Sequence, residues 1–212
     1  MKEQKVNSIN AHGRGRGFST VEMLIVVAVS IIITAMAITQ IQPALANARA
    51  DSAMKEVVDQ LRQAREYAIS NRRYIQVTFP VKVVGGQTQY QVQMTELNAA
   101  PLGPGGANVV MPAVPIQSPM TFYVYPTLPD TPDGYGNANK IEFEGIAGGP
   151  VAGMGFQSDG ELVDLATLSP INGTVFLGVV GEPYASRAVT VLGTTGRVRG
   201  WKAPSKTGWV QF

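Results

Sequence analysis

Residues 14–43 read RGRGFSTVEMLIVVAVSIIITAMAITQIQP. A basic, glycine-rich stretch ends at Gly17, and an almost unbroken apolar run follows from Phe18 to Ile41, with Glu22 as its one charge. As a helix, the 25 residues from Phe18 to Gln42 span about 37 Å at roughly 1.5 Å per residue, whereas a bilayer core needs about 30 Å. The stretch therefore predicts a helix that can cross a membrane with some tilt. A carboxylate near the start of such a helix is costly, so Glu22 is predicted to be functional.

The charges outside this run set the expected orientation. The whole chain has 17 Lys and Arg against 15 Asp and Glu, but residues 1–17 hold four of the basic residues and only one of the acidic ones. The rest of the chain is therefore nearly neutral, at a net −1. Because positive charge directly before an apolar helix stays in the cytoplasm, residues 1–17 are expected inside and the C-terminal domain outside.

An ordinary secretory signal peptide is the alternative for this N-terminus. It would require a small-residue cleavage site after the apolar run, and Ala35-Met36-Ala37 has that composition. The run is long for a signal peptide, and a periodic helical pattern continues beyond it, so the membrane helix is preferred.

The next segment, from Pro43 to about Asn71, has the pattern of an amphipathic helix that packs on its own domain. Its apolar residues recur at three- and four-residue steps: Met54, Val57, Val58, Leu61, Ala64 and Ala68. Charged residues line the other side: Lys55, Asp59, Arg62 and Glu66. Pro43 is expected to kink or interrupt the helix, since proline removes a backbone donor and clashes with the preceding turn.

After Arg73 the pattern changes to the alternation of β-strands. The expected strands are 74–79, 89–95, 121–125, 140–144, 153–157, 174–180, 187–192 and 197–201, and residues 97–119 read as a long loop. Turns are expected at Gly85-Gly86, Asp133-Gly134, Asp159-Gly160 and Gly193–Gly196. One long helix followed only by strands predicts an α+β fold in which antiparallel sheets pack on the helix stripe.

The sequence G-F-S-T-V-E at residues 17–22, followed by the apolar helix, closely resembles the class III leader junction of type IV prepilins and type II secretion pseudopilins. The resemblance implies that a prepilin peptidase cuts between Gly17 and Phe18 and that the new N-terminus on Phe18 is methylated. It also implies that Glu22, the fifth residue after the cut, pairs with the N-terminal amine of a neighbouring subunit during assembly. Within one chain, Phe18 and Glu22 are one helical turn apart, so an intramolecular pair is the alternative.

The C-terminal part resembles the GspH/FimT branch of minor pseudopilins and minor pilins. The matching stretches are Gly155-Phe-Gln-Ser-Asp-Gly160, the apolar strand Thr174–Val180, the strand that begins at Arg187, and the turn and strand Thr195-Gly-Arg-Val-Arg199. The resemblance covers both ends of the chain and leaves residues 80–150 largely unmatched. The expected organisation is a cleaved leader at 1–17, a membrane and filament-core helix at 18–42, its amphipathic continuation at 43–73 and a β-rich domain at 74–212.

The residue inventory disfavours an enzyme and a metal site. The chain has no cysteine, and its single histidine, His12, lies in the expected leader. Nucleophilic His pairs, most zinc sites and disulfides are therefore unavailable to the mature chain. Two sets of oxygen-bearing side chains are candidate calcium ligands. The first is Asp130, Asp133 and Asn137, and the second is Asp159, Glu161 and Asp164. Neither set has the spacing of an EF-hand. We expect no cofactor and no metal.

Nucleic acid is the remaining partner class. Arg197, Arg199 and Lys202 lie in a segment without acidic residues that also holds Trp201 and Trp209. Cations neutralise phosphates and aromatic rings stack on bases, and residues two apart on a strand share a face, as Arg197 and Arg199 would. In the resembled branch, some minor pilins bind DNA during natural transformation through such a stretch. A structural role for the two arginines is preferred.

The expected function is that of a minor subunit that initiates or caps a type II secretion pseudopilus or a type IV pilus. The expected partners are a prepilin peptidase, other pilin or pseudopilin subunits, an inner-membrane assembly platform and the membrane. The expected location is the bacterial inner membrane, with a single pass and a periplasmic C-terminal domain. The alternatives are a DNA-binding minor pilin, and a membrane-tethered binding domain outside the pilin class.

Overall fold

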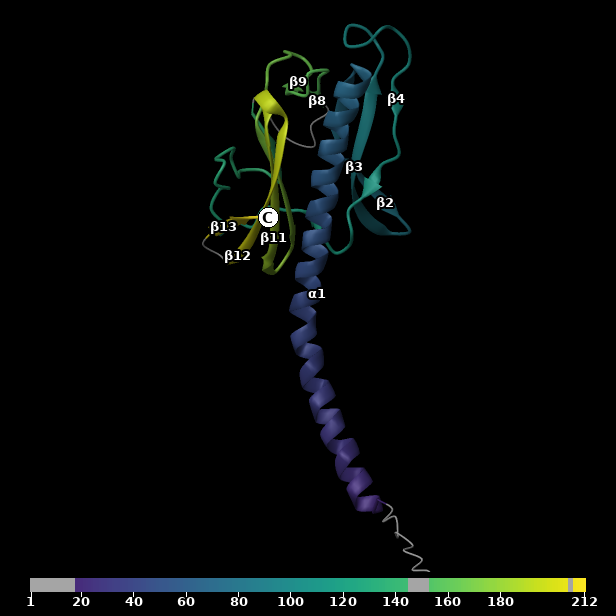
Figure 1. Cartoon of the computed structure of the whole chain (residues 1–212), viewed down its shortest axis with the longest axis vertical. Helices are drawn as coiled ribbons and strands as arrows, with labels where there is room; N and C mark the ends of the chain where they lie inside the picture. Colours follow the sequence, from purple (N-terminus) through teal and green to yellow (C-terminus); the bar gives the residue numbers. More distant parts are fainter. Residues whose placement is uncertain (1–17, 145–152, 206–207) are drawn as a thin grey trace, which may run out of the picture. The chain divides into compact units, whose positions relative to one another are not determined.

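The computed structural model describes residues 18–144, 153–205 and 208–212, without the side chains of residues 38–40, 42, 43 and 205. This part of the chain is α+β: a long N-terminal helix, α1, precedes antiparallel strands (Figure 1). The chain divides into two compact units, residues 1–43 and residues 44–212. We call them the helical unit and the β unit. Gly17 and the expected leader lie outside the described residues.

The helix α1 (Thr20–Asn71) contributes to both units. Its backbone stays α-helical on both sides of Pro43, so the expected interruption is absent, although the boundary between the units falls directly after this residue. Within the β unit the expected stripe is confirmed, because its six apolar residues from Met54 to Ala68 are all buried. The four charged residues assigned to the other side are exposed or partly exposed.

A seven-stranded antiparallel sheet packs on one side of α1 in the β unit. Its main strands are ordered β2 (Val81–Val84), β3 (Gln87–Leu97), β1 (Tyr74–Thr78), β8 (Met154–Phe156) and β9 (Leu162–Asp164), and β4 (Val109–Val110) and β5 (Val114–Pro115) also pair with β3. The β2–β3 hairpin closes at Gly85-Gly86, where φ is +59° and +79°. Glycine adopts this left-handed backbone without the strain that a Cβ would cause, which is why the expected turn forms here.

A six-stranded antiparallel sheet packs on the other side. Its order is β13 (Gly208–Gln211), β12 (Arg197–Ser205), β11 (Glu182–Leu192), β10 (Gly173–Val179) and β6 (Thr121–Phe122), and β7 (Ile141–Phe143) pairs with β10. The 3₁₀ turn η1 (Gly193–Thr195) joins β11 to β12. Arg187, Val189 and Val191 of β11 face α1, whereas Ala188 and Thr190 face away from it.

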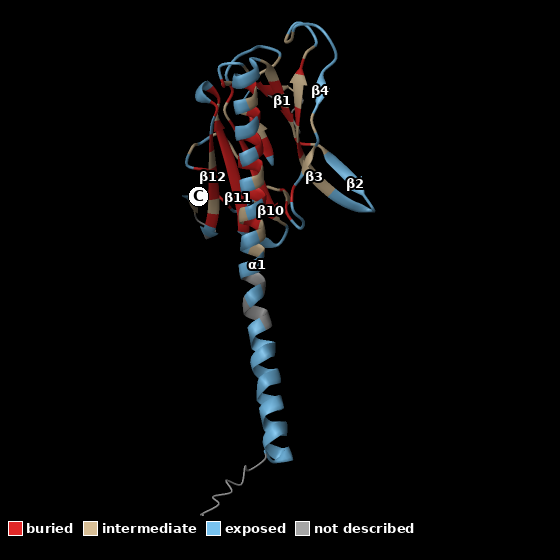
Figure 2. Cartoon of the chain, turned by 45° about the vertical axis from the view of Figure 1, so that its right-hand side comes forward, coloured by how far each residue is buried: buried red, intermediate tan, exposed pale blue. Residues whose placement is uncertain are grey.

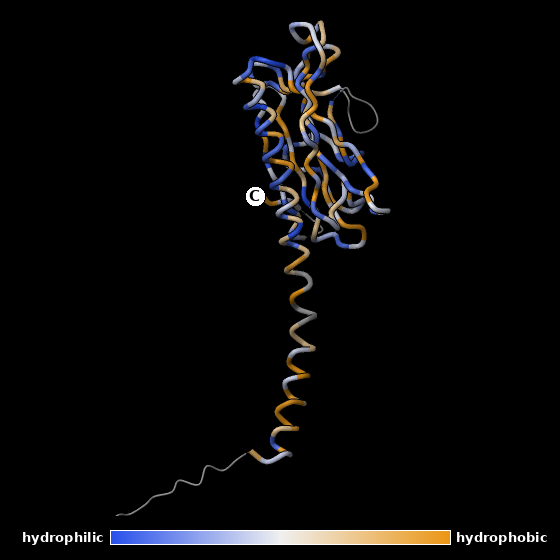
Figure 3. Tube along the Cα trace, turned by 90° about the vertical axis from the view of Figure 1, so that its right-hand side faces the viewer, coloured by the Kyte–Doolittle hydropathy of each residue, from blue (hydrophilic) through white to orange (hydrophobic). Residues whose placement is uncertain are grey.

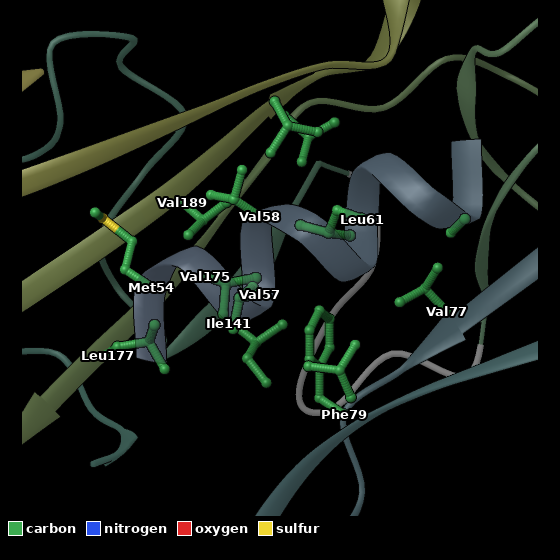
Figure 4. Close-up of a cluster of buried hydrophobic side chains, with 14 of the residues drawn as sticks. Met54, Val57, Val58, Leu61, Val77, Phe79, Ile141, Val175, Leu177 and Val189 are labelled. Atoms are coloured by element: carbon green, nitrogen blue, oxygen red, sulfur yellow. The ribbon is translucent and has the colours of Figure 1, made fainter. Parts of the chain in front are cut away.

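The core of the β unit lies where the buried face of α1 packs between the two sheets, and the opposite face of the helix stays exposed (Figures 1 and 2). Leu61, Val57 and Met54 of α1 are fully buried in a cluster with side chains of both sheets, among them Val77 of β1 and Val175 of β10 (Figure 4). A smaller cluster of Phe176, Ala188 and Trp201 lies on the outer face of the six-stranded sheet. Because the chain has no cysteine, no disulfide joins these layers.

Several strand predictions need correction. The expected loop at 97–119 contains the short strands β4 and β5, and the strands β2, β9 and β13 were not predicted. The strand β12 is longer than expected and runs on to Ser205. The strands β2, β9 and β13 lie at sheet edges and each pairs with the neighbouring strand in sequence, whereas the two-residue strands β4 and β5 both pair with β3.

Candidate functional site

In the helical unit, the described stretch Thr20–Ala37 presents an apolar surface on every side. Thr20–Ala37 is long and apolar enough to cross a membrane, and none of this window is buried (Figures 2 and 3). A helix that is apolar all round is stable only when lipid or other helices cover it. The two hydroxyl groups in its middle are satisfied inside the helix: Ser30 Oγ donates to Val26 O, and Thr34 Oγ1 donates to Ser30 O, both at 2.7 Å. Because both hydroxyl protons have carbonyl acceptors within the helix, they do not require hydrogen bonds to water.

Glu22 caps the start of this helix. Its Oε2 accepts a hydrogen bond from the backbone N–H of Ser19 at 2.9 Å, and the backbone N–H of Val21 donates to Ser19 Oγ at 3.4 Å. Ser19 is thus the N-cap: its hydroxyl accepts from Val21 N–H, and Glu22, the third helical residue, reaches back to the Ser19 N–H as in a capping box. The negative charge also lies favourably at the positive end of the helix dipole. Phe18, beside the expected cut, is 80% exposed.

The cations predicted as a DNA surface do not form one surface. Arg197 and Arg199 lie opposite Leu192 and Thr190 of β11 and share one face of β12, as the spacing predicted, and Arg197, the first residue of the strand, also borders α1. Lys202 lies opposite Arg187, on the face turned toward α1, and its Nζ is 5.8 Å from the ring centre of Phe212. The expected trio is therefore split between two faces of one strand.

Arg199 is part of a polar cluster centred on Asp133, whose side chain is 10% exposed. Arg199 Nη1 donates to Asp133 Oδ1 at 2.5 Å, while Thr190 Oγ1 and Trp201 Nε1 donate to Asp133 Oδ2 at 2.5 Å and 3.2 Å. Burial, followed by the charge of Asp133, raises the pKa of the nearby Tyr135 phenol. The Arg199 charge is compensated, which favours the structural role for this residue.

Neither tryptophan of the predicted DNA surface is a free stacking platform. Trp201 is buried and hydrogen-bonded within the Asp133 cluster. Trp209 Nε1 donates to the carbonyl of Pro129 at 2.8 Å, and its ring lies 6.0 Å from that of Phe176. Both rings hold the segment around residues 129–133 against the outer face of the sheet.

Arg187, the first residue of the motif strand, is buried and ties β11 to α1. Its Nε donates to Asp51 Oδ1 at 2.7 Å, and its Nη1 donates to the carbonyls of Tyr184 and Ser186 at 3.0 Å and 2.9 Å. Only 4% of the Arg187 side chain is exposed, against 33% of the Asp51 side chain. Arg187 therefore joins helix and sheet.

Arg197 is exposed and lines a cleft together with Arg62 and Arg65 of α1. Of the three cations predicted from the sequence, Arg197 is exposed, whereas Arg199 and Lys202 are partly buried. The sequence did not place the two α1 arginines beside it, because they precede it by more than a hundred residues.

The carboxylates that are candidate calcium ligands accept hydrogen bonds from nearby residues in local turns. Asp130 accepts from the backbone N–H groups of Thr131 and Gly136, and Asp164 accepts from Ala166 N and Thr167 Oγ1. Asp159 and Glu161 both accept from Gln157 Nε2, at 2.9 Å and 3.0 Å. Within residues 18–144, 153–205 and 208–212, no group of three or more His, Cys, Asp or Glu side chains is placed to hold a metal ion.

Comparison of the chain with models of known protein families, with curated proteins and with solved structures found no match.

Proposed function

We propose that the chain is a membrane-anchored subunit of a helical filament, in the class of type IV pilins and type II secretion pseudopilins. The observation that carries this proposal is the apolar surface of Thr20–Ala37, which is exposed on every side and follows a basic segment. Lipid covers such a surface while the subunit waits in the membrane, and neighbouring helices cover it in a filament. Glu22 is the single charge of the run, so its pairing can fix the position of one packed helix relative to the next.

The proposed maturation follows from the junction at Gly17 and Phe18. A prepilin peptidase removes residues 1–17 on the cytoplasmic side and methylates the amine of Phe18. The inner-membrane assembly platform then lifts the helix out of the bilayer, and the β unit remains on the periplasmic side. Within the class we propose a minor subunit that helps to initiate or cap the filament, because the Arg187 strand and the Gly196-Arg197-Val198-Arg199 segment resemble that branch.

The structural roles of two motif residues support this assignment. Arg187 joins β11 to α1 through Asp51, and Arg199 joins β12 to the segment around Asp133. Both arginines therefore stabilise the β unit, as a structural motif of a subunit would. The geometry gives less support to a DNA surface made of Arg197, Arg199 and Lys202.

Replacing Gly17 with Glu tests the proposed processing. When the chain is co-expressed with a prepilin peptidase, the wild type is expected to lose residues 1–17, and Gly17→Glu is expected to keep them, because the bulky charged side chain replaces the hydrogen of the residue at the cut. The loss is read as a mobility shift on a gel. Gly13→Glu, which adds the same charge upstream of the junction, is the matched control and is expected to be processed normally.

Two outcomes would contradict the proposal. A wild-type chain that keeps its size with the active peptidase would favour a membrane-tethered binding domain outside the class. Equal processing of wild type and Gly17→Glu would place the cut elsewhere.

A further inference from the structure

A cleft of about 590 Å³ lies beside α1, where the turn between β11 and β12 approaches the helix. Three arginines line it: Arg62 and Arg65 from α1, and Arg197 from β12. Glu66 is the acidic residue of the lining. The lining therefore includes three basic residues and one acidic residue.

These three guanidinium groups are not neutralised by ion pairs. Within the described residues, no carboxylate lies within 4.0 Å of a side-chain nitrogen of Arg62, Arg65 or Arg197. By contrast, Arg73, Arg187 and Arg199 each form an ion pair with an acidic residue. Positive charges gathered in a cleft produce a stronger local potential than the same charges on an open surface.

Arg65 is held in position by the backbone around it. Its Nε donates to the carbonyl of Gly160 at 3.2 Å. A Cβ at Gly196, where φ is +60°, would lie 2.0 Å from that carbonyl oxygen and 2.7 Å from Arg65 Nε. Only glycine lets the turn approach so closely. The contact occupies Arg65 Nε and leaves the two terminal amino groups as further donors.

We propose that this cleft binds a phosphate-type oxyanion through Arg62, Arg65 and Arg197. The planar guanidinium fork matches the geometry of phosphate oxygens, and charge-assisted hydrogen bonds of this kind are the strong ones. Arg65, fixed by Gly160, gives the site one pre-oriented donor, and the exposed Arg62 and Arg197 close on the anion from the helix and from the strand. The phosphate source is a free phosphate monoester or a lipid headgroup. This inference does not depend on filament assembly.

Phosphate titration of the full chain in neutral detergent, at constant ionic strength, tests the site. Isothermal titration with inorganic phosphate is expected to show saturable binding at about millimolar concentration. Arg197→Ala and Arg62→Ala are each expected to weaken binding by about tenfold or more, the effect of losing one charge-assisted contact. Lys82→Ala removes an exposed positive charge from the edge strand β2 and is the control, with an expected change of less than about twofold.

A charge-conserving variant separates a built site from a general positive potential. Arg197→Lys is expected to bind phosphate about threefold to tenfold more weakly than wild type, because lysine keeps the charge but loses the fork. Equal weakening by Lys82→Ala, or unchanged affinity in Arg197→Ala, would overturn the proposal. Thermal unfolding of each variant checks folding, and Arg62 and Arg197 are both exposed, so neither substitution should lower the midpoint noticeably.

Two further probes identify the source of the phosphate. If the affinity for inorganic phosphate is the same with and without lipid, a free phosphate monoester is favoured as the ligand. A lipid headgroup is favoured when nanodiscs that contain phosphatidic acid compete with phosphate for the wild type, whereas pure phosphatidylcholine nanodiscs do not. Arg197→Ala should show no such competition. Saturable binding of a single-stranded oligonucleotide without any binding of inorganic phosphate would overturn the oxyanion site and indicate a nucleic-acid surface.

Discussion

Glu22→Gln is expected to leave leader removal intact and to lower the amount of the chain recovered in assembled filaments by about tenfold or more. Glutamine keeps the oxygen that accepts the hydrogen bond from Ser19 N–H, so the capping box and the start of α1 survive. It removes the charge that would pair with the N-terminal amine of a neighbouring Phe18. Losing one partner of an ion pair in an apolar environment costs about 3–5 kcal/mol, enough for a large loss of incorporation.

Comparison with Glu22→Ala separates the two roles of this side chain. Alanine removes both the charge and the cap, and losing a cap costs about 1 kcal/mol of helix stability. If the charge governs assembly, both variants are processed and both fail to incorporate to a similar degree. Normal incorporation of Glu22→Gln, with loss only in Glu22→Ala, would show that Glu22 acts as a cap and not as a charge partner. Incorporation is measured in sheared filaments, with the membrane fraction as the reference.

Arg187→Ala is expected to destabilise the β unit by about 3 kcal/mol, at the lower end of the range for breaking a buried ion pair, because Asp51 keeps some contact with water. The substitution leaves the Asp51 carboxylate and the carbonyls of Tyr184 and Ser186 without their guanidinium donor. For a unit of this size, the unfolding midpoint should fall by roughly 10 °C. Near-ultraviolet circular dichroism of the full chain in detergent follows the loss of packing.

Arg62→Ala is the matched control for this prediction. It removes the same side chain from an exposed position, where the expected change is within about 0.5 kcal/mol. Asp51→Asn keeps the side-chain oxygen that accepts from Arg187 and is expected to cost less than Arg187→Ala. Equal midpoints for Arg187→Ala and Arg62→Ala would mean that the Arg187 contacts contribute nothing net to stability.

The elements that the sequence predicted well are those with a strong local pattern. The stripe from Met54 to Ala68 repeats at helical spacing over four turns, and the Gly85-Gly86 turn needs a backbone that glycine favours. The strand β2 was missed because it follows Pro80 directly and all its residues are exposed, so no alternation marks it. The strand β9 has only three residues and depends on pairing with β8.

The site residues were predictable only as far as local spacing determines them. The shared face of Arg197 and Arg199 follows from strand geometry alone, and Ser19-x-x-Glu22 carries the capping-box pattern in the sequence itself. The partners of the other arginines are distant: Asp133 lies 66 residues before Arg199, and Asp51 lies 136 residues before Arg187. Such pairs depend on how strands register and on which side of the sheet the helix packs, and a single sequence does not encode either locally.

The intact mass of the chain, purified from membranes that contain a prepilin peptidase, tests the central claim most directly. The proposed filament subunit predicts a product that begins at Phe18 and carries one added methyl group on its N-terminal amine. A mass that corresponds to cleavage after Ala37, or to the complete chain with residues 1–17 attached, would contradict it.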